Sequence, residues 1–298
     1  RALIAGHDAP FDYLCHAFFD WKRGAGEGAR EPDSASPATV EAERRDGFEA
    51  TSSDAVVWAN RGGGKTFLAA VATLLDLVHK PGISVRILGG SLEQSKRLYA
   101  HLRALFEGSA LMGQVDGKIT QRGLKLVNGS EAQVLAQSQT AVRGTRVQKI
   151  RCDEVELFDP EVWEAAQLAT MGKHCGKGEG RSWVPGTIEC LSTMHVPYGL
   201  MYRIVGEARR SGAMMEREEG KGDVSSPGRT LFKWGVIDVL EKCPEARDCS
   251  ACPLEGACGG RAKRNEEPRE PGGQVGGHLA VSDVVRLRSR VGEGTWQA

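Results

Sequence analysis

A glycine-rich stretch that ends in lysine and threonine is the part of this sequence best suited to chemistry. Residues 58 to 66 read WANRGGGKT and directly follow the apolar run AVV at residues 55 to 57. The window from Ala59 to Thr66 matches the pattern G-x-x-x-x-G-K-[ST] at every fixed position except the first, where alanine replaces glycine. The match predicts a loop that wraps the phosphates of a nucleotide.

The residue types in this loop suit anions for separate reasons. Because glycine has no Cβ, the backbone N–H groups of Gly62, Gly63 and Gly64 can approach anionic oxygens closely. Lys65 would reach the β- and γ-phosphates, and the Thr66 hydroxyl would hold Mg²⁺. The loop by itself does not exclude a strand-to-helix turn that binds no nucleotide.

An acid pair, Asp153 and Glu154, directly follows the strand-like segment QKIRC. Ligands of parallel sheets bind at the carboxyl ends of the strands, so Asp153 can hold Mg²⁺ through water while Glu154 faces the γ-phosphate. Glu154 is then a candidate general base that orients and polarises the attacking water. Such a pair can also cap a helix, but after the GGGKT loop it indicates hydrolysis of a nucleoside triphosphate.

A third motif, LSTMH, ends another strand-like segment and places Ser192 and Thr193 at the same edge of the expected sheet. Hydroxyl groups there can sense the γ-phosphate, although Ser and Thr also commonly end strands. We interpret His195 as a surface or core histidine, because nothing near it in the sequence supplies a catalytic triad.

The segments between these motifs alternate between strand and helix patterns, which predicts an α/β fold. We expect a P-loop NTPase of the RecA/ASCE-like type, with a mostly parallel sheet and helices on both faces. The Asn128-Gly129 pair predicts a hairpin within residues 123–136. The expected strands are 54–59, 83–90, 147–155 and 186–193, and the expected helices are 65–80, 91–108, 160–170 and 198–212.

Composition excludes several classes of protein. The chain has 298 residues, of which 40% are hydrophobic, enough for a sizeable core in one large domain. Its 39 basic and 39 acidic residues cancel, so no overall charge attracts it to nucleic acid or to a membrane. No apolar run approaches the roughly 20 residues that span a bilayer, and no signal peptide opens the chain. We therefore expect an intracellular protein, and the start at Arg1 suggests a piece of a longer one.

Four cysteines gather within sixteen residues, at Cys243, Cys249, Cys252 and Cys258, with the spacing C-x5-C-x2-C-x5-C. Because intracellular thiols stay reduced, disulfides are not expected, and four thiolates around a C-x2-C pair favour tetrahedral Zn²⁺. An iron–sulfur cluster also takes four cysteines and stays open as an alternative, as do unligated thiols. We expect this site to be a structural staple that follows the nucleotide-binding core.

The segments WANRGGGKT, ILGGSLEQSKRLYAHL, QSQTAVRGTRVQKIRCDEV and LSTMH, in this order and spacing, resemble the ATPase domain of the large terminase subunit of tailed bacteriophages. The resemblance covers roughly residues 54 to 240. It implies an ATPase that pumps double-stranded DNA into a procapsid in the cytoplasm of the host cell. The implied partners are the portal protein, the small terminase subunit and other copies of the chain in a ring on the portal.

The same resemblance implies roles for single residues. Arg61 would act on the phosphates during hydrolysis, and Ser192 and Thr193 would couple hydrolysis to DNA movement. The acid pair would supply the Mg²⁺ ligand and the catalytic carboxylate. The implied catalytic residues are Glu154, Arg61 and Lys65, and ATP and Mg²⁺ would bind to Asn60, Arg61, Gly62, Gly63, Gly64, Lys65, Thr66 and Asp153.

Members of this family usually carry a C-terminal nuclease of RNase H-like fold, built on several carboxylates that hold divalent metals. After Asp248 this chain has a single aspartate, Asp283, so we expect no nuclease activity from it. The expected organisation is an N-terminal segment with a flexible insertion at 1–53, an ATPase domain at 54–240, a metal-binding segment at 241–265, and a linker toward a missing nuclease at 266–298.

The case for DNA contact from the residues alone rests on one basic stretch. Between Lys118 and Arg151 the sequence holds seven basic residues and one acidic residue, Glu131, a net charge of +6. Contacts to phosphates without reading of bases are expected, because a packaging motor must accept any sequence. The candidate contacts are Arg122, Lys125, Arg143 and Arg146.

Two other functions fit part of the sequence. A helicase-like translocase shares the phosphate loop, the acid pair and a Ser/Thr motif, but no second RecA-like domain is evident after residue 240. A metal-stapled nucleotide-binding module would need no poised base, and Glu154 therefore speaks against it.

Overall fold

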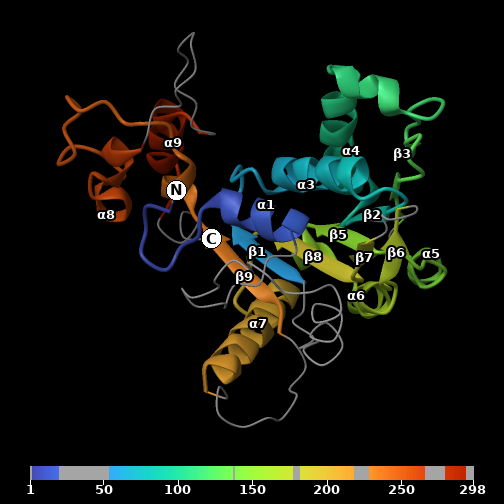
Figure 1. Ribbon diagram of the computed structural model, residues 1–298. Helices are drawn as coiled ribbons and strands as arrows, with labels where there is room; N and C mark the ends of the chain where they lie inside the picture. Colours follow the sequence, from blue (N-terminus) through green and yellow to red (C-terminus); the bar gives the residue numbers. More distant parts are fainter. Residues whose placement is uncertain are drawn as a thin grey trace, which may run out of the picture.

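A seven-stranded sheet forms the centre of the fold in the computed structural model, which describes residues 2–19, 54–136, 138–176, 182–217, 228–265 and 279–292 (Figure 1). The strand order is β3-β4-β2-β5-β8-β1-β9, and all neighbours are parallel except the antiparallel pair β3 and β4. The strands are β1 (Ala55–Ala59), β2 (Ser84–Gly89), β3 (Gly123–Lys125), β4 (Glu131–Val134), β5 (Lys149–Asp153), β8 (Thr187–Ser192) and β9 (Thr230–Trp234). A separate antiparallel pair joins β6 (Lys173–Cys175) to β7 (Ser182–Val184).

Helices cover both faces of this sheet, as the sequence predicts (Figure 1). One face carries α1 (Pro10–Phe19), α3 (Lys65–His79) and α4 (Leu92–Glu107), and the other carries α6 (Pro160–Gln167) and α7 (Leu200–Arg217). Local sequence fixes several ends, since the Ser91 side chain caps α4 and Asp159 caps α6 just before Pro160. The short helices are α5 (Gln139–Arg143), α8 (Glu255–Cys258) and α9 (Val281–Arg288), with 3₁₀ turns at Ala110–Gln114, Val155–Leu157, Val236–Val239 and Arg261–Arg264.

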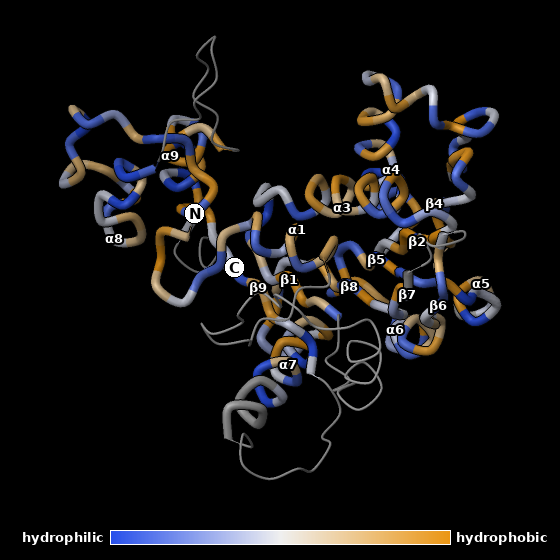
Figure 2. The backbone as a smooth tube through the Cα atoms, in the orientation of Figure 1, coloured by the Kyte–Doolittle hydropathy of each residue, from blue (hydrophilic) through white to orange (hydrophobic). Residues whose placement is uncertain are grey.

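Two hydrophobic cores lie on the two faces of the sheet. Strand β5 is fully buried, and its successive side chains point to opposite faces of the sheet, so the charged Lys149 and Arg151 lie on the face opposite to Ile150 and Cys152. Ile150 and Cys152 pack in the core under α6 and α7. Hydrophobic residues run along α3, which packs in the other core (Figure 2). The expected α/β architecture with helices on both faces is therefore observed.

Two elements that were not predicted from the sequence, β9 and α1, complete the core on the α3 face of the sheet. The edge strand β9 pairs in parallel with β1 over its full length. Helix α1 packs with Tyr13 and Ala17 in the same core as α3, so the described part of the N-terminal segment is attached to the predicted ATPase domain. Residues 20–53, where a flexible insertion was expected, lie outside the described residues.

A small third core lies beyond β9 and holds the cysteine-rich segment (Figure 1). Its backbone is joined to α9 through Leu279, whose N–H donates to Val239 O at 3.1 Å and whose carbonyl accepts from Glu241 N at 2.9 Å. The described residues of the expected C-terminal linker therefore pack against this unit. The buried members of this core are Ile237, Leu240, Cys243, Leu254, Ala262, Val281 and Val284.

Candidate active site

The glycine-rich loop connects the end of β1 to the start of α3, as expected for a phosphate loop. Gly62 and Gly64 have φ angles of 74° and 81°, in the left-handed region that glycine adopts without steric cost. At Gly63 a Cβ would lie 2.7 Å from Asn60 Oδ1, so a larger residue would displace the loop. Asn60 itself donates to Arg61 O at 2.7 Å, and Arg61 is exposed at the tip of the loop.

Lys65 is almost fully buried, with 4% of its surface exposed, at the first residue of α3. Its Nζ donates to Asn60 O at 3.0 Å, to Thr193 Oγ1 at 3.1 Å and to Ala59 O at 3.3 Å. Burial lowers the pKa of Lys65, while the nearby carboxylates of Glu154 and Asp153 act in the opposite direction. The contact with Thr193 joins the phosphate loop directly to the end of β8.

Asp153 and Thr66 together form a set of oxygen donors beside the loop. The Thr66 hydroxyl donates to Asp153 Oδ2 at 3.0 Å, while Asp153 Oδ1 is buried without a hydrogen-bond partner among the described residues. Burial raises the pKa of Asp153 to about 6, against the lowering effect of the Thr66 hydrogen bond. A carboxylate and a hydroxyl are ligands that Mg²⁺ accepts, and an unpartnered buried carboxylate oxygen fits a role in holding a cation.

Glu154 has φ of 54° and is the single non-glycine residue with positive φ in the described part of the chain. This left-handed conformation is costly for a residue with a Cβ, and such strain concentrates at functional sites. The Glu154 side chain is half-buried, and its Oε2 lies 3.5 Å from Ser192 Oγ. The structure therefore places the predicted base next to a predicted coupling residue.

Ser192 also contacts Glu156, a residue that the sequence reading missed. The Glu156 N–H donates to Ser192 Oγ at 3.2 Å, and the Glu156 carboxylate accepts from the Met201 N–H at 2.8 Å in the first turn of α7. A Cβ at Gly199 would lie 2.0 Å from Glu156 Oε1, so glycine permits this approach. A chain of contacts thus runs from Glu154 to the longest helix described.

Gln94 is a second residue that the sequence reading left without a role. Its Oε1 is buried and has no hydrogen-bond partner among the described residues. A Cβ at Gly90 would lie 2.7 Å from this oxygen and 3.0 Å from Glu154 O, so Gln94 and the acid pair approach the same glycine. The Gly90 N–H donates to Asp153 O at 3.1 Å. The Gln94 amide therefore lies on the same side of Gly90 as the backbone carbonyl of Glu154.

Trp234, at the end of β9, supports the phosphate loop from the side. Its indole N–H donates to Gly63 O at 2.8 Å, and 2% of the residue is exposed. No local sequence pattern signals this contact, because it depends on β9 pairing next to β1.

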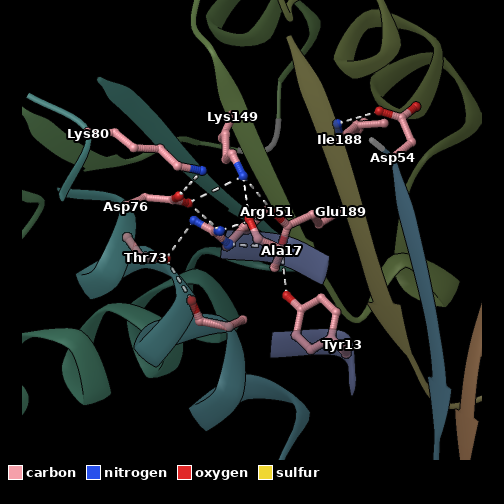
Figure 3. A network of polar contacts seen from close by, with 11 residues as sticks. Tyr13, Ala17, Asp54, Thr73, Asp76, Lys80, Lys149, Arg151, Ile188 and Glu189 are labelled. Carbon is pink, nitrogen blue, oxygen red and sulfur yellow. Dashed lines mark hydrogen bonds and ion pairs between the residues drawn. The ribbon is translucent and has the colours of Figure 1, made fainter. Parts of the chain in front are cut away.

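A buried network of charges links the elements that carry the site (Figure 3). Arg151 on β5 donates two hydrogen bonds to the Glu189 carboxylate, at 2.9 and 3.0 Å, and one to Asp76 Oδ2 at 2.6 Å. Burial alone would raise the pKa of Asp76, but Lys149, Arg151 and Lys80 together hold it below its usual value.

This charge network also reaches the N-terminal helix. The Tyr13 hydroxyl donates to Glu189 Oε2 at 2.6 Å, and Lys149 donates to the carbonyl of Ala17. Since α3 begins with Lys65, while β5 and β8 end at the acid pair and Ser192, the network ties together the elements that present all three motifs.

The predicted DNA-contacting side chains are exposed, but they belong to a smaller basic surface than the sequence suggests. Lys149 and Arg151, which contribute to the net charge of this stretch, are buried in the charge network. Basic residues on one face of a strand predict a solvent-exposed face. The acidic partners that bury these residues come from distant segments and are known only from the fold. The exposed candidates are Arg122, Lys125, Arg143 and Arg146.

All four clustered cysteines line one pocket in the third core. Within the described ranges, however, no three His, Cys, Asp or Glu side chains are arranged to hold a single metal ion. The zinc prediction is therefore not supported by the structure. His195 is exposed, so of its two interpretations, a surface or a core histidine, the structure favours the surface one.

Among the described helices, none is long and apolar enough to cross a membrane.

Comparisons with known proteins identify the fold. No protein-family model and no curated protein matches the chain. The large terminase of bacteriophage HK97 is 14% identical with a TM-score of 0.54, covering 95% of this chain and 52% of that chain. The large terminase of a thermophilic bacteriophage is 10% identical with a TM-score of 0.43, covering 68% of this chain and 46% of that chain.

The ATPase domain of the large terminase of a Thermus phage also matches, with 13% identity and a TM-score of 0.42, covering 62% of this chain and 76% of that chain. This chain spans about half the length of the first two terminases. The mostly parallel sheet and the HK97 likeness together confirm the predicted P-loop NTPase architecture. The chain shares its fold with about half of the HK97 large terminase.

Proposed function

We propose that this chain is the ATP-hydrolysing motor domain of a phage large terminase, which drives double-stranded DNA into a procapsid. The observation that carries the proposal is the convergence of three motifs at one edge of the sheet. Lys65 contacts Thr193, Thr66 contacts Asp153, and Ser192 lies next to Glu154. A fold shared with the HK97 large terminase supports the same conclusion.

The loop residues would bind the triphosphate. The backbone N–H groups around Gly63 would face the anionic oxygens at the start of α3, where the helix dipole adds partial positive charge. Lys65 would leave its carbonyl partners to reach the β- and γ-phosphates, and the exposed Arg61 would stabilise charge on the γ-phosphate during hydrolysis. Asn60 would complete the loop.

Thr66 and Asp153 would hold Mg²⁺, directly or through water. The ion would neutralise charge that develops on the β- and γ-phosphates. Asp153 must be deprotonated for this role, and its raised pKa means that the cation competes with a proton.

Glu154 would take a proton from the attacking water. The Gln94 amide oxygen would accept a second hydrogen bond from that water and fix its position. This oxygen has no partner among the described residues and lies beside Gly90, which also approaches the backbone of Glu154. Thr193 and Ser192 would sense the loss of the γ-phosphate through Lys65 and Glu154. Glu156 would pass that signal to α7 through its contact with the Met201 N–H.

DNA would be held through phosphates, with no reading of sequence, by the exposed residues Arg122, Lys125, Arg143 and Arg146. The portal protein, the small terminase subunit and neighbouring copies in a ring complete the proposed partners. The proposed place of action is the host cell cytoplasm, with transient docking on the procapsid and no membrane contact.

The test is steady-state ATP turnover of the chain with duplex DNA, single-stranded DNA or neither, across a salt series. We expect slow basal turnover that duplex DNA of any sequence raises, with stimulation that fades as salt rises because phosphate contacts release counterions. Glu154→Gln serves as the inactive control. Preference for single strands would favour a helicase-like translocase instead, and no magnesium-dependent turnover at all would refute the ATPase.

A further inference from the structure

The clustered cysteines lie in a unit that has little else to hold it together. Among the described residues this third core contains seven buried side chains, and its helices α8 and α9 are four and eight residues long. A hydrophobic core of this size is marginal, and small units of this kind commonly depend on a disulfide or a metal. All four thiols are free of disulfides in the structure.

The backbone bends so that all four cysteines face one pocket. The Cys252 N–H donates to Cys249 O at 3.0 Å, and Cys258 is followed by Gly259 and Gly260 with φ of 50° and 75°. A Cβ at Gly260 would lie 3.9 Å from Cys249 Sγ, so the second turn passes close to the opposite wall. Cys243, which precedes the other three cysteines in the chain, completes the lining.

Polar groups around the pocket suit negatively charged sulfur. The Ala262 N–H donates to Cys258 Sγ at 3.4 Å, a type of contact that stabilises a thiolate. Arg247 and Lys263 line the same pocket and would offset part of the charge of four thiolates, while Glu255 in the same lining adds one negative charge. The apolar side chains of Leu240 and Leu254 shield the interior from water.

The arrangement of the cysteines favours one of two inorganic ligands, a single zinc ion or an iron–sulfur cluster. A single tetrahedral zinc ion holds each sulfur at about 2.3 Å, so its four sulfurs crowd around one point. Among the described side chains, no three His, Cys, Asp or Glu residues are placed to hold one ion, although all four cysteines line a common pocket. A polynuclear cluster fits this arrangement better, because its cysteines bind separate iron atoms on the outside of a larger body.

We infer that Cys243, Cys249, Cys252 and Cys258 bind an iron–sulfur cluster that staples this unit beside the phosphate loop. The unit reaches the loop through Leu279, since a Cβ at Gly62 would lie 3.4 Å from Leu279 Cδ2. The inference concerns a separate site and does not depend on the proposed ATPase activity.

The experiment is metal analysis of the chain purified without oxygen and without added metal. We expect iron and acid-labile sulfide in equal amounts, zinc well below one per chain, and visible absorption that bleaches on reduction. Cys249→Ser and Cys252→Ser should lose most of the iron. Cys15→Ser, which changes a cysteine of α1 outside the pocket, is the matched control and should keep it.

Because a variant that fails to fold would also lose iron, the content of the unaltered chain decides the matter. One zinc per chain would overturn the inference in favour of a single ion. Absence of iron, both as purified and after anaerobic incubation with ferrous iron and sulfide, would overturn it in favour of unligated thiols. Neither result would change the expected ATP turnover, which is measured separately.

Discussion

The Thr66 hydroxyl donates a 3.0 Å hydrogen bond to Asp153, and this contact joins the start of α3 to the end of β5. Two motifs that lie far apart in the sequence therefore meet at one pair of oxygens. The second carboxylate oxygen of Asp153 is buried and unpartnered among the described residues, which supports the proposal that the pair holds a cation. Its properties can be tested without measuring catalysis.

Magnesium should stabilise the protein increasingly as pH rises toward neutrality. Burial raises the folded-state pKa of Asp153 to about 6, above its ordinary value of 3.8, so the protonated form is favoured in the fold. Without Mg²⁺, the contribution of Asp153 to the free energy of unfolding is full below about pH 4 and is lost as pH rises through about 6. Thermal unfolding with and without Mg²⁺ across this range measures the effect. In Asp153→Asn both trends should disappear, and an unchanged response would contradict the assignment.

Lys65 and Glu154 should affect ATP hydrolysis differently. Lys65→Ala should weaken both nucleotide binding and turnover, because it removes the cation that is proposed to contact the phosphates in ground and transition states. Glu154→Gln should keep nucleotide binding and slow turnover by at least roughly 100-fold, the scale of a lost general base. Equilibrium nucleotide binding together with steady-state turnover separates the two. Parental turnover in Glu154→Gln would assign the base elsewhere.

The backbone conformation of Glu154 should lower the free energy of unfolding of the protein. Its φ of 54° is unfavourable for any residue with a Cβ, by about 1 to 2 kcal/mol. Both Glu154→Gly and Glu154→Ala remove the carboxylate, so comparing them isolates the backbone term. We expect the glycine variant to have the higher free energy of unfolding, by about 1 kcal/mol, in denaturant titrations. An alanine variant as stable as the glycine variant would show that no strain is stored there.

Removing Arg151 should destabilise the protein strongly. Arg151→Met would leave the Asp76 and Glu189 carboxylates with fewer partners in the interior, which typically costs about 3 to 5 kcal/mol. The control is Arg103→Ala, which breaks an exposed ion pair with Glu107 and should cost less than about 1 kcal/mol. Denaturant titration measures both. Adding Glu189→Gln to Arg151→Met should recover part of the loss, and a further loss would contradict the pairing.

The central strands and their helices could be predicted because their sequence patterns are local. Strands β1, β5 and β8 are short apolar runs that end in the motifs, and α3 and α4 have apolar residues at helical spacing. These features depend on neighbours in the chain, so the positions of Lys65 and Asp153 follow from them.

The remaining features depend on contacts between distant segments. Lys149 and Arg151 read as part of a basic surface, yet their partners come from α1, α3 and β8 and bury them. Glu156 carries no sequence signal beyond its place after the acid pair, because its partner lies in the first turn of α7. The cysteine spacing predicts a metal centre but does not distinguish an ion from a cluster, and the common pocket that the four cysteines line depends on the fold.

The hydrogen bond from Trp234 to Gly63 gives the protein a natural optical sensor. Indole emission shifts in colour and intensity when the hydrogen bonding or polarity around the ring changes, and this ring contacts the loop that is proposed to bind ATP. Nucleotide entry could therefore be followed by intrinsic fluorescence in the unlabelled chain, with Trp234→Phe removing the signal. A residue that supports the loop mechanically thus also makes its occupancy visible.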